Sequence, residues 1–341
     1  MRVGLVLGAG GVVGASWLIG ALDALESETG LAPARANVIV GTSAGSVVGA
    51  MGAAGVPPAL LAAYASGRPL RELADLEDLV GDELDEIERI ASDSPDRFRL
   101  QLALPPVGPG SWRMALSTLR RPLRHTPAAV LGGWLPRGVV STAPIRRLVE
   151  RLVGEAWPQR LRVVACDYRS GRRTVFGAPD APAATPADAV AASCAIPGFY
   201  HPVAVDRRRY VDGGVCSPSN LDLLCREDVD VAVCLNPMST SARVPRSLNP
   251  VAQVSGAMRA AASKRLASET RKLEAAGVRV VTIEPSAADL AVMGHNLMAR
   301  GRRAEVTEQA YRSVARRLRR RTLPDFGVGP EKTRAPLRRV A

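Results

Sequence analysis

Short apolar runs alternate with amphipathic stretches along most of this chain. Five of these runs, each bounded by turn residues, lie near residues 2–7, 37–41, 161–166, 231–235 and 278–283. Runs of this length predict buried β-strands, and the periodicity of three to four residues between them predicts helices. Strands that alternate with helices build a mainly parallel sheet covered on both faces. The pattern therefore predicts an α/β protein with three layers, α/β/α.

Further elements complete this picture. Residues 173–176 and 208–211 favour strands that join the sheet in antiparallel directions. A helix is expected from about Ala15 to Glu28, and longer helices over residues 251–276 and 304–317, where apolar positions recur three or four apart. We find no internal repeat, and we interpret residues 1–317 as a single domain.

Residues 64–137 do not follow the alternation, and we predict that they form a helical cap inserted into the domain. Their first half is acidic, whereas after Pro105-Pro106 arginines are interleaved with apolar residues that include Trp112 and Trp134. Cationic and tryptophan side chains together suit an anionic membrane surface. An ordinary cap helix with its arginines in water explains the same pattern.

The formal net charge is +12, and residues 312–341 hold nine arginines and one lysine against two carboxylates. A like-charge block of this kind usually stays solvated, so residues 318–341 are expected to form a basic, disordered tail. Such a tail favours an anionic membrane as partner. Nucleic acid is not expected, because no aromatic-rich RNA motif or helix-turn-helix accompanies the charge.

Composition excludes several classes of protein. The sequence has no stretch of 18 uninterrupted apolar residues that could span a bilayer, and because it opens on its first strand we expect no cleavable leader. We therefore expect a cytoplasmic protein, peripheral at most to the inner face of the membrane. The five cysteines have no metal-ligand spacing, which predicts buried free thiols, no disulfide and no metal.

The first candidate for chemistry is Ser43, in the sequence Gly41-Thr42-Ser43-Ala44-Gly45. It lies between the strand at 37–41 and a helical stretch that ends near Ala54. A serine at such a turn points out above the sheet, and the N-terminus of the following helix lies beneath any oxyanion formed there. The alternative is that Ser43 merely caps this helix.

A glycine-rich turn at residues 8–14, with Gly8, Gly10, Gly11 and Gly14, follows the first strand. Such a turn presents backbone N–H groups that bind either a phosphate or an oxyanion. A dinucleotide site would also need an acidic residue about 20 positions further on, and only Glu26 and Glu28 approach that spacing. Both fall on the expected helix or its end, which weakens the nucleotide interpretation.

Asp212 begins the turn Asp212-Gly213-Gly214 at the end of a strand. A serine hydroxyl is a weak nucleophile until a base accepts its proton, and Asp212 could be that base. Asp-Gly is also a common tight-turn dipeptide.

The glycine-rich turn, the serine elbow and the Asp-Gly-Gly turn, in this order and spacing, resemble the patatin-like phospholipase family. The segment 189–199 and the strand that leads to Asp212 resemble it too, so that the resemblance extends over about residues 1–317. It implies that Ser43 is the nucleophile, that Asp212 is the base and that the Gly10 and Gly11 N–H groups, aided by that of Ala44, hold the oxyanion. No cofactor is implied. The expected function is a serine lipid acyl hydrolase of the phospholipase A or lysophospholipase type.

One departure from the family is Val13, which stands where members usually carry Arg or Lys before the last glycine of the loop. Because this cation is missing, the alternative stays open that the protein is an inactive member of the fold that only binds lipid. Among the histidines, His295 would fall third in the order Ser, Asp, His of an α/β-hydrolase triad. His201 and His125 have no suitable partner motif.

Overall fold

The computed structural model describes residues 1–66, 110–120, 132–242 and 249–320. Most of the predicted cap and the basic tail therefore lie outside the described residues. The five predicted strands are confirmed, each within one residue: β1 Val3–Leu7, β2 Val38–Thr42, β3 Leu161–Asp167, β7 Val231–Leu235 and β8 Arg279–Ile283. The first four are buried as expected, whereas β8, at the edge of the sheet, is mostly half-buried.

These five strands are parallel to one another in a sheet to which the described residues contribute eight strands. Seven follow the order β5-β6-β3-β2-β1-β7-β8, and β4 pairs with β3 beside this path. The antiparallel strands predicted at residues 173–176 and 208–211 are also confirmed. β4 Arg173–Phe176 and β6 Arg208–Asp212 both pair with β3, and β5 Val203–Val205 adds to β6. Because β1 and β2 are neighbours, the glycine-rich turn and the serine elbow leave the sheet side by side at the carboxyl ends of their strands.

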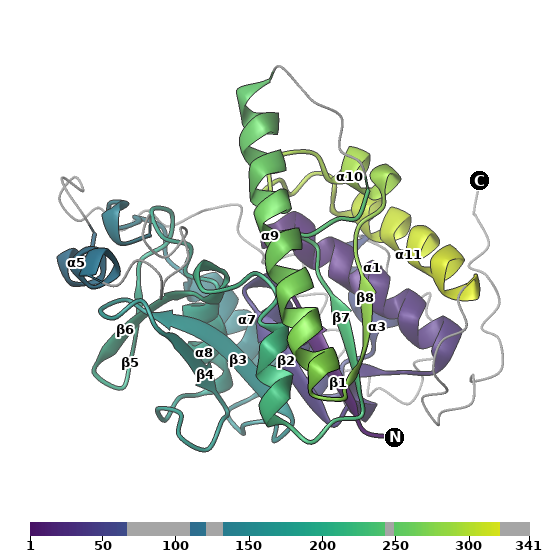
Figure 1. Ribbon diagram of the computed structural model, residues 1–341, viewed down its shortest axis with the longest axis horizontal. Helices are drawn as coiled ribbons and strands as arrows, with labels where there is room; N and C mark the ends of the chain where they lie inside the picture. The colour runs from purple at the N-terminus through teal and green to yellow at the C-terminus, as the bar shows by residue number, and fades with distance from the viewer. Residues whose placement is uncertain (67–109, 121–131, 243–248, 321–341) are drawn as a thin grey trace.

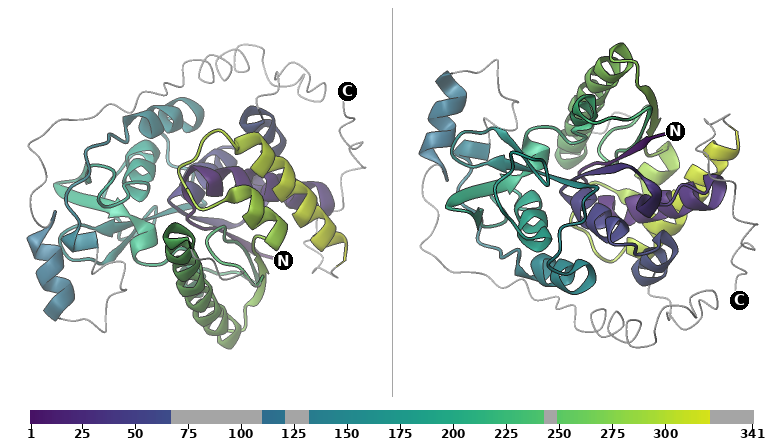
Figure 2. Two further views of the ribbon diagram at one scale, coloured as in Figure 1. Left: turned by 90° about the horizontal axis from the view of Figure 1, so that it is seen from above. Right: turned by 90° about the horizontal axis from the view of Figure 1, so that it is seen from below.

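Helices cover both faces of the sheet, which confirms the three-layer α/β/α fold (Figures 1 and 2). One face carries α9 Pro250–Ala275 and the 3₁₀ helix η6 Leu221–Arg226. The other carries α1 Gly11–Thr29, α2 Ala44–Ala53 and α8 Pro186–Ser193. Further helices pack outside them or at the edges: α3 Pro58–Ala65, α5 Trp112–Arg120, α7 Ala143–Val153, α10 Ala287–Met293 and α11 Arg303–Arg319, with the short turns η1 Pro33–Arg35 and η5 Gly213–Val215.

The strand sequences explain why both faces need cover. In β1, Leu5 and Leu7 pack into the core beneath α1, whereas Val6 packs with Leu224 and Leu266 on the face of α9. Continuous burial of this kind suits a parallel strand, since neither of its faces meets water. α9 covers one face of the sheet although its sequence is polar, because its buried Leu266 and Leu273 are separated by charged residues.

Two expectations need correction. The first helix begins at Gly11 rather than near Ala15, because the second half of the glycine-rich turn is itself helical. The cysteines are free, as predicted, but not all of them are buried. Cys225 is exposed at the end of η6, and Cys216 is half-buried.

Candidate active site

Ser43 stands at the junction of β2 and α2 in a strained conformation. Its φ is 52° and its ψ is −121°, a positive φ that costs a residue with a side chain energy that the surrounding structure must offset. The Ser43 N–H donates to Ser193 Oγ at 2.8 Å, and Ser193 Oγ donates to the carbonyl of Val164 at 2.6 Å. The strain is therefore held by a buried serine of α8 that is itself fixed to β3.

Gly45 lets α2 start so close to the sheet. A Cβ at this position would overlap the carbonyl oxygen of Leu7, at the end of β1. Within the described part of the chain, the N–H groups of Ala44 and Gly45 meet no acceptor. These groups and the positive end of the α2 dipole lie beside the Ser43 side chain, where negative charge would be stabilised.

Two N–H groups of the glycine-rich turn form hydrogen bonds within the fold, and two others are left for a ligand. Gly8 and Ala9 donate to the carbonyls of Leu235 and Pro218, at 2.9 and 2.8 Å. Gly10 and Gly11 have no acceptor among the described residues. Gly11 needs to be glycine, because its φ is +63° and a Cβ would lie 2.7 Å from the carbonyl oxygen of Leu297.

Asp212 closes the site from the end of β6. One carboxylate oxygen accepts the Gly214 N–H at 2.7 Å, and only 6% of the residue is exposed. Burial raises the pKa of Asp212 to about 6, opposed by side-chain hydrogen bonding with Ser43 and by the bond from Gly214. The two residues predicted to form the dyad therefore lie within reach of one another.

The remaining motif glycines allow backbones to touch around these groups. A Cβ at Gly10 would lie 2.6 Å from the Cα of Gly14, and one at Gly41 would lie 2.6 Å from the Cα of Ser46. A Cβ at Gly213 would overlap the carbonyl of Val164, and one at Gly214 would lie 3.3 Å from the Cβ of Ala9. The Asp-Gly-Gly turn thus packs directly against the glycine-rich turn.

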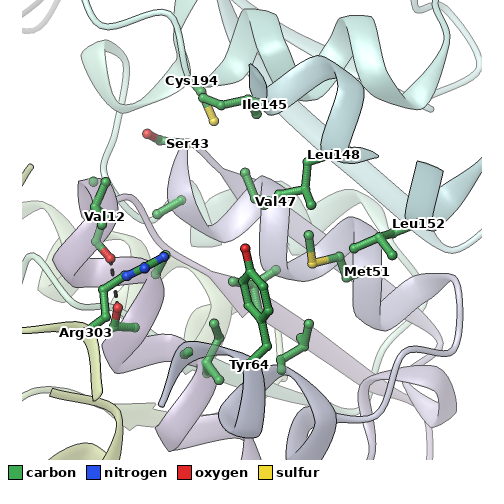
Figure 3. Close-up of a pocket in the computed structure, with 18 of the residues that line it drawn as sticks. Val12, Ser43, Val47, Met51, Tyr64, Ile145, Leu148, Leu152, Cys194 and Arg303 are labelled. Carbon is green, nitrogen blue, oxygen red and sulfur yellow. Dashed lines mark hydrogen bonds between the residues drawn. The ribbon is translucent and has the colours of Figure 1, made fainter. Parts of the chain in front are cut away.

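Beside Ser43 lies a cavity of about 220 Å³ (Figure 3). Its lining is mainly apolar and comes mostly from α1, α2, α3 and α7, with Met51, Leu148 and Leu152 at the end away from the glycine-rich turn. An apolar lining of this kind suits an apolar guest such as a hydrocarbon chain.

A family model described as patatin-like phospholipase matches residues 5–224, a range that includes the two glycine turns and the serine elbow. The chain belongs to the patatin-like phospholipase family. This supports a lipid acyl hydrolase at the level of the family. The range ends well before residue 317, up to which the sequence resemblance was expected to extend.

Among solved structures, the chain is similar to that of VipD from Legionella pneumophila, with 16% identity and a TM-score of 0.44 over 93% of this chain and 67% of that one. No curated protein matches the chain.

In this patatin-like protein, the residues that suggested other interpretations of the sequence either lie away from Ser43 or already have partners. His295 lines a separate surface groove with Met258 and Leu297, and none of the described residues that line the cavity is a histidine. Glu28 lies at the far end of α1 from the glycine-rich turn and pairs with Arg319. Val13 is 2% exposed and belongs to the core. His125 lies outside the described residues.

No cluster of potential metal ligands occurs in the described ranges. Cys194 also lines the cavity, but burial raises the pKa of its thiol, so it stays protonated at neutral pH.

A buried acid that the sequence did not single out anchors the site from behind. Glu269 of α9 is fully buried and accepts hydrogen bonds from Ser217 Oγ at 2.8 Å, Ser219 Oγ at 2.6 Å and the Leu221 N–H at 2.9 Å. Arg265, one turn earlier, pairs with it at 2.7 Å. Glu269 thereby fixes the segment 217–221, which follows the Asp-Gly-Gly turn.

This segment touches all three parts of the site. Its Pro218 carbonyl accepts the Ala9 N–H of the glycine-rich turn. Its Asn220 side-chain amide donates to Thr42 Oγ1 at 3.0 Å, one residue before Ser43, and Asn220 is held with φ 53°. The role of this segment could have been found from sequence only by considering residues 212–221 together with α9.

A second missed group is Arg259, also on α9. It is 4% exposed, donates to the Pro237 carbonyl at 2.7 Å, and has its pKa lowered to about 10 by burial. Pro237 lies against Gly10 and Gly14. A positive charge therefore stands behind the glycine-rich turn, although position 13 supplies none.

Proposed function

We propose that this protein is a serine lipid acyl hydrolase of the phospholipase A or lysophospholipase type, working through a Ser43–Asp212 dyad. The observation that carries the proposal is the side-chain hydrogen bond between the buried Asp212 carboxylate and the strained Ser43, which lines an apolar cavity. Family membership supports the lipid ester as the substrate class.

Asp212, with a pKa of about 6, is ionised at neutral pH and accepts the proton of the Ser43 hydroxyl as Ser43 Oγ attacks the ester carbonyl. The former carbonyl oxygen becomes an oxyanion that the N–H groups of Gly10, Gly11 and Ala44 stabilise. Asp212 returns the proton to the leaving alcohol. Water then attacks the acyl-serine with Asp212 again as base, which releases the fatty acid and restores Ser43.

A fluorophosphonate probe tests the nucleophile. It should modify Ser43 and leave Ser16, a serine that lines the same cavity, unmodified when the sites are mapped by mass spectrometry. Ser43→Ala should abolish both labelling and ester hydrolysis, and Asp212→Asn should slow both. A protein that binds lipid yet neither labels nor hydrolyses any ester would be an inactive lipid-binding member of the fold, and the proposal would be wrong.

We also propose that the protein contacts membranes through the described part of the insertion. α5 is fixed by the buried Met114 but exposes Trp112 (64%) and Leu116 (48%), and the ring of Trp134 (43% exposed) meets that of Trp112 edge-on at 6.2 Å. Exposed tryptophans favour the boundary between headgroups and acyl chains. No helix in the described ranges is long and apolar enough to cross a bilayer.

Sedimentation with anionic vesicles tests this contact. Replacing Trp112 and Trp134 by Ala should weaken vesicle binding by about tenfold or more, because two large apolar groups no longer enter the membrane. Val254→Ala is the matched control, since Val254 is 61% exposed on α9. An equal loss in both variants, or none in the tryptophan variant, would contradict the proposal.

A further inference from the structure

One charged residue stands in the apolar cavity beside Ser43. Among the described residues of its lining, only Arg303 carries a charge, and Figure 3 shows its guanidinium directed into the cavity between Val12 and Tyr64. Arg303 is exposed, and no carboxylate in the described ranges pairs with it. Its neighbour Arg302 instead pairs with Glu305 at 3.1 Å.

The fold holds Arg303 in this place. It is the first residue of α11, which packs along α1. Thr307 Oγ1 donates to the carbonyl of Ser16 at 3.1 Å, and Gly20 of α1 allows the two backbones to touch, because a Cβ there would overlap the carbonyl of Thr307. The start of α11 is therefore fixed over the first half of α1, next to the glycine-rich turn.

The cavity consequently has two chemically different ends. Arg303 lies at one end, beside Val12, and Met51, Leu148 and Leu152 lie at the other, with the Tyr64 hydroxyl, which has no hydrogen-bond partner among the described residues, between them (Figure 3). A guanidinium binds phosphate or carboxylate oxygens through paired N–H donors. Arg259 cannot play this part because it is buried behind the turn, whereas Arg303 can touch a ligand.

We propose that Arg303 is a specificity-determining residue that binds the phosphate of a phosphate-bearing acyl ester while the acyl chain occupies the apolar end. This inference rests on the proposed hydrolase function. Arg303 would then supply, from a distant helix, the contact with the headgroup for which Val13 has no charge.

Two soluble esters with the same short acyl chain test the assignment: a lysophosphatidate, which carries a phosphate, and the monoacylglycerol, which lacks it. Arg303→Met keeps the apolar stem and should lower kcat/KM for the phosphate ester about 10- to 100-fold, the loss typical of a charged hydrogen bond. It should change kcat/KM for the neutral ester less than about twofold, because that ester makes no ionic contact. Arg303→Lys should recover part of the loss.

Arg302→Met is the matched control, since Arg302 starts the same helix, is exposed and does not line the cavity. The proposal would be overturned if Arg302→Met had the same effect, if Arg303→Met slowed both esters equally, or if it left the phosphate ester unchanged. If Arg303→Met weakens inhibition by the free fatty acid and leaves the ratio of the two esters unchanged, the residue binds the product carboxylate instead.

Binding separates this inference from the hydrolase itself. An ether analogue of the lysophosphatidate, which cannot be hydrolysed, should bind the Ser43→Ala protein by calorimetry, and adding Arg303→Met should weaken its binding about 10- to 100-fold. If the wild-type protein hydrolyses neither ester while the Ser43→Ala protein still binds the analogue through Arg303, the hydrolase is refuted and the Arg303 site stands. Equal binding to both proteins would refute the Arg303 site.

Discussion

Asp212→Asn should make the protein more stable while it removes the proposed base. The pKa of Asp212 is raised by burial from 3.8 to about 6, so the folded state holds the carboxyl proton more tightly than the unfolded chain does. A shift of this size corresponds to about 3 kcal/mol of unfolding free energy. An asparagine fits the same space, can still accept the Gly214 N–H through its amide oxygen, and carries no charge to desolvate.

Because the pKa of Asp212 is raised in the folded state, the stability difference between Asp212→Asn and the wild type depends on pH. At pH 4 and below, Asp212 is protonated in the folded protein, and its burial costs no ionic desolvation. As the pH rises from about 4 to 6, the unfolded state ionises first, and the wild-type protein loses stability relative to the variant. Above pH 6 the loss is complete, so Asp212→Asn should be more stable by about 3 kcal/mol at pH 8 and by little at pH 4.

Urea unfolding of both proteins at pH 4, 6 and 8 measures this difference, and comparing the two isolates Asp212 from every other group that titrates. The m-values should agree, so that the shift in midpoint reports free energy. A variant that is less stable than the wild type at pH 8, or more stable by the same amount at every pH, would refute the assignment of the raised pKa to a buried, ionised Asp212.

Two more predictions follow from the same geometry. If Asp212 is the base, kcat/KM should rise about tenfold per pH unit below its pKa of about 6 and level off above it; a midpoint near 7 that moves when His201 or His295 is replaced would assign the base to a histidine. Glu269→Ala leaves the Ser217 and Ser219 hydroxyls and the Leu221 N–H without their acceptor, and should lower both the unfolding free energy, by about 3 kcal/mol, and kcat. Urea unfolding and hydrolysis assays compare it with Glu305→Ala, whose exposed ion pair contributes less than about 1 kcal/mol; equal losses would contradict the anchoring role.

The sequence indicates those parts of the candidate site in which the reactive residue and the glycines that shape its turn are neighbours in the chain. The turn at Ser43 needs a strand, a serine and glycines within five residues, and the turn after Asp212 needs the glycines that follow it, so each leaves a contiguous signal. The central strands were predictable for the same reason, because a parallel strand buried on both faces must be apolar throughout.

Residues that act across long sequence separations left no such signal. Glu269 lies in a helix whose charged residues suggest an exposed surface, and its burial depends on hydroxyls some 50 residues earlier. Arg303 is one of many arginines near the C-terminus, and only the packing of α11 on α1 brings it to the cavity. The exposure of Cys225 was missed because the apolar residues around it, Leu223 and Leu224, face the core from one side of a short 3₁₀ helix.

The buried Glu269 on α9 also bears on how much of the chain must be present for the site to fold. A fragment ending at residue 224 would keep the serine elbow and both glycine turns, yet it would lack the carboxylate that ties their connecting segment together. It would also lack β7, and the strand that delivers the glycine-rich turn would become a bare sheet edge. The stretch that matches the family and the unit that folds together therefore have different boundaries, and an engineered minimal version of this protein would have to follow the second.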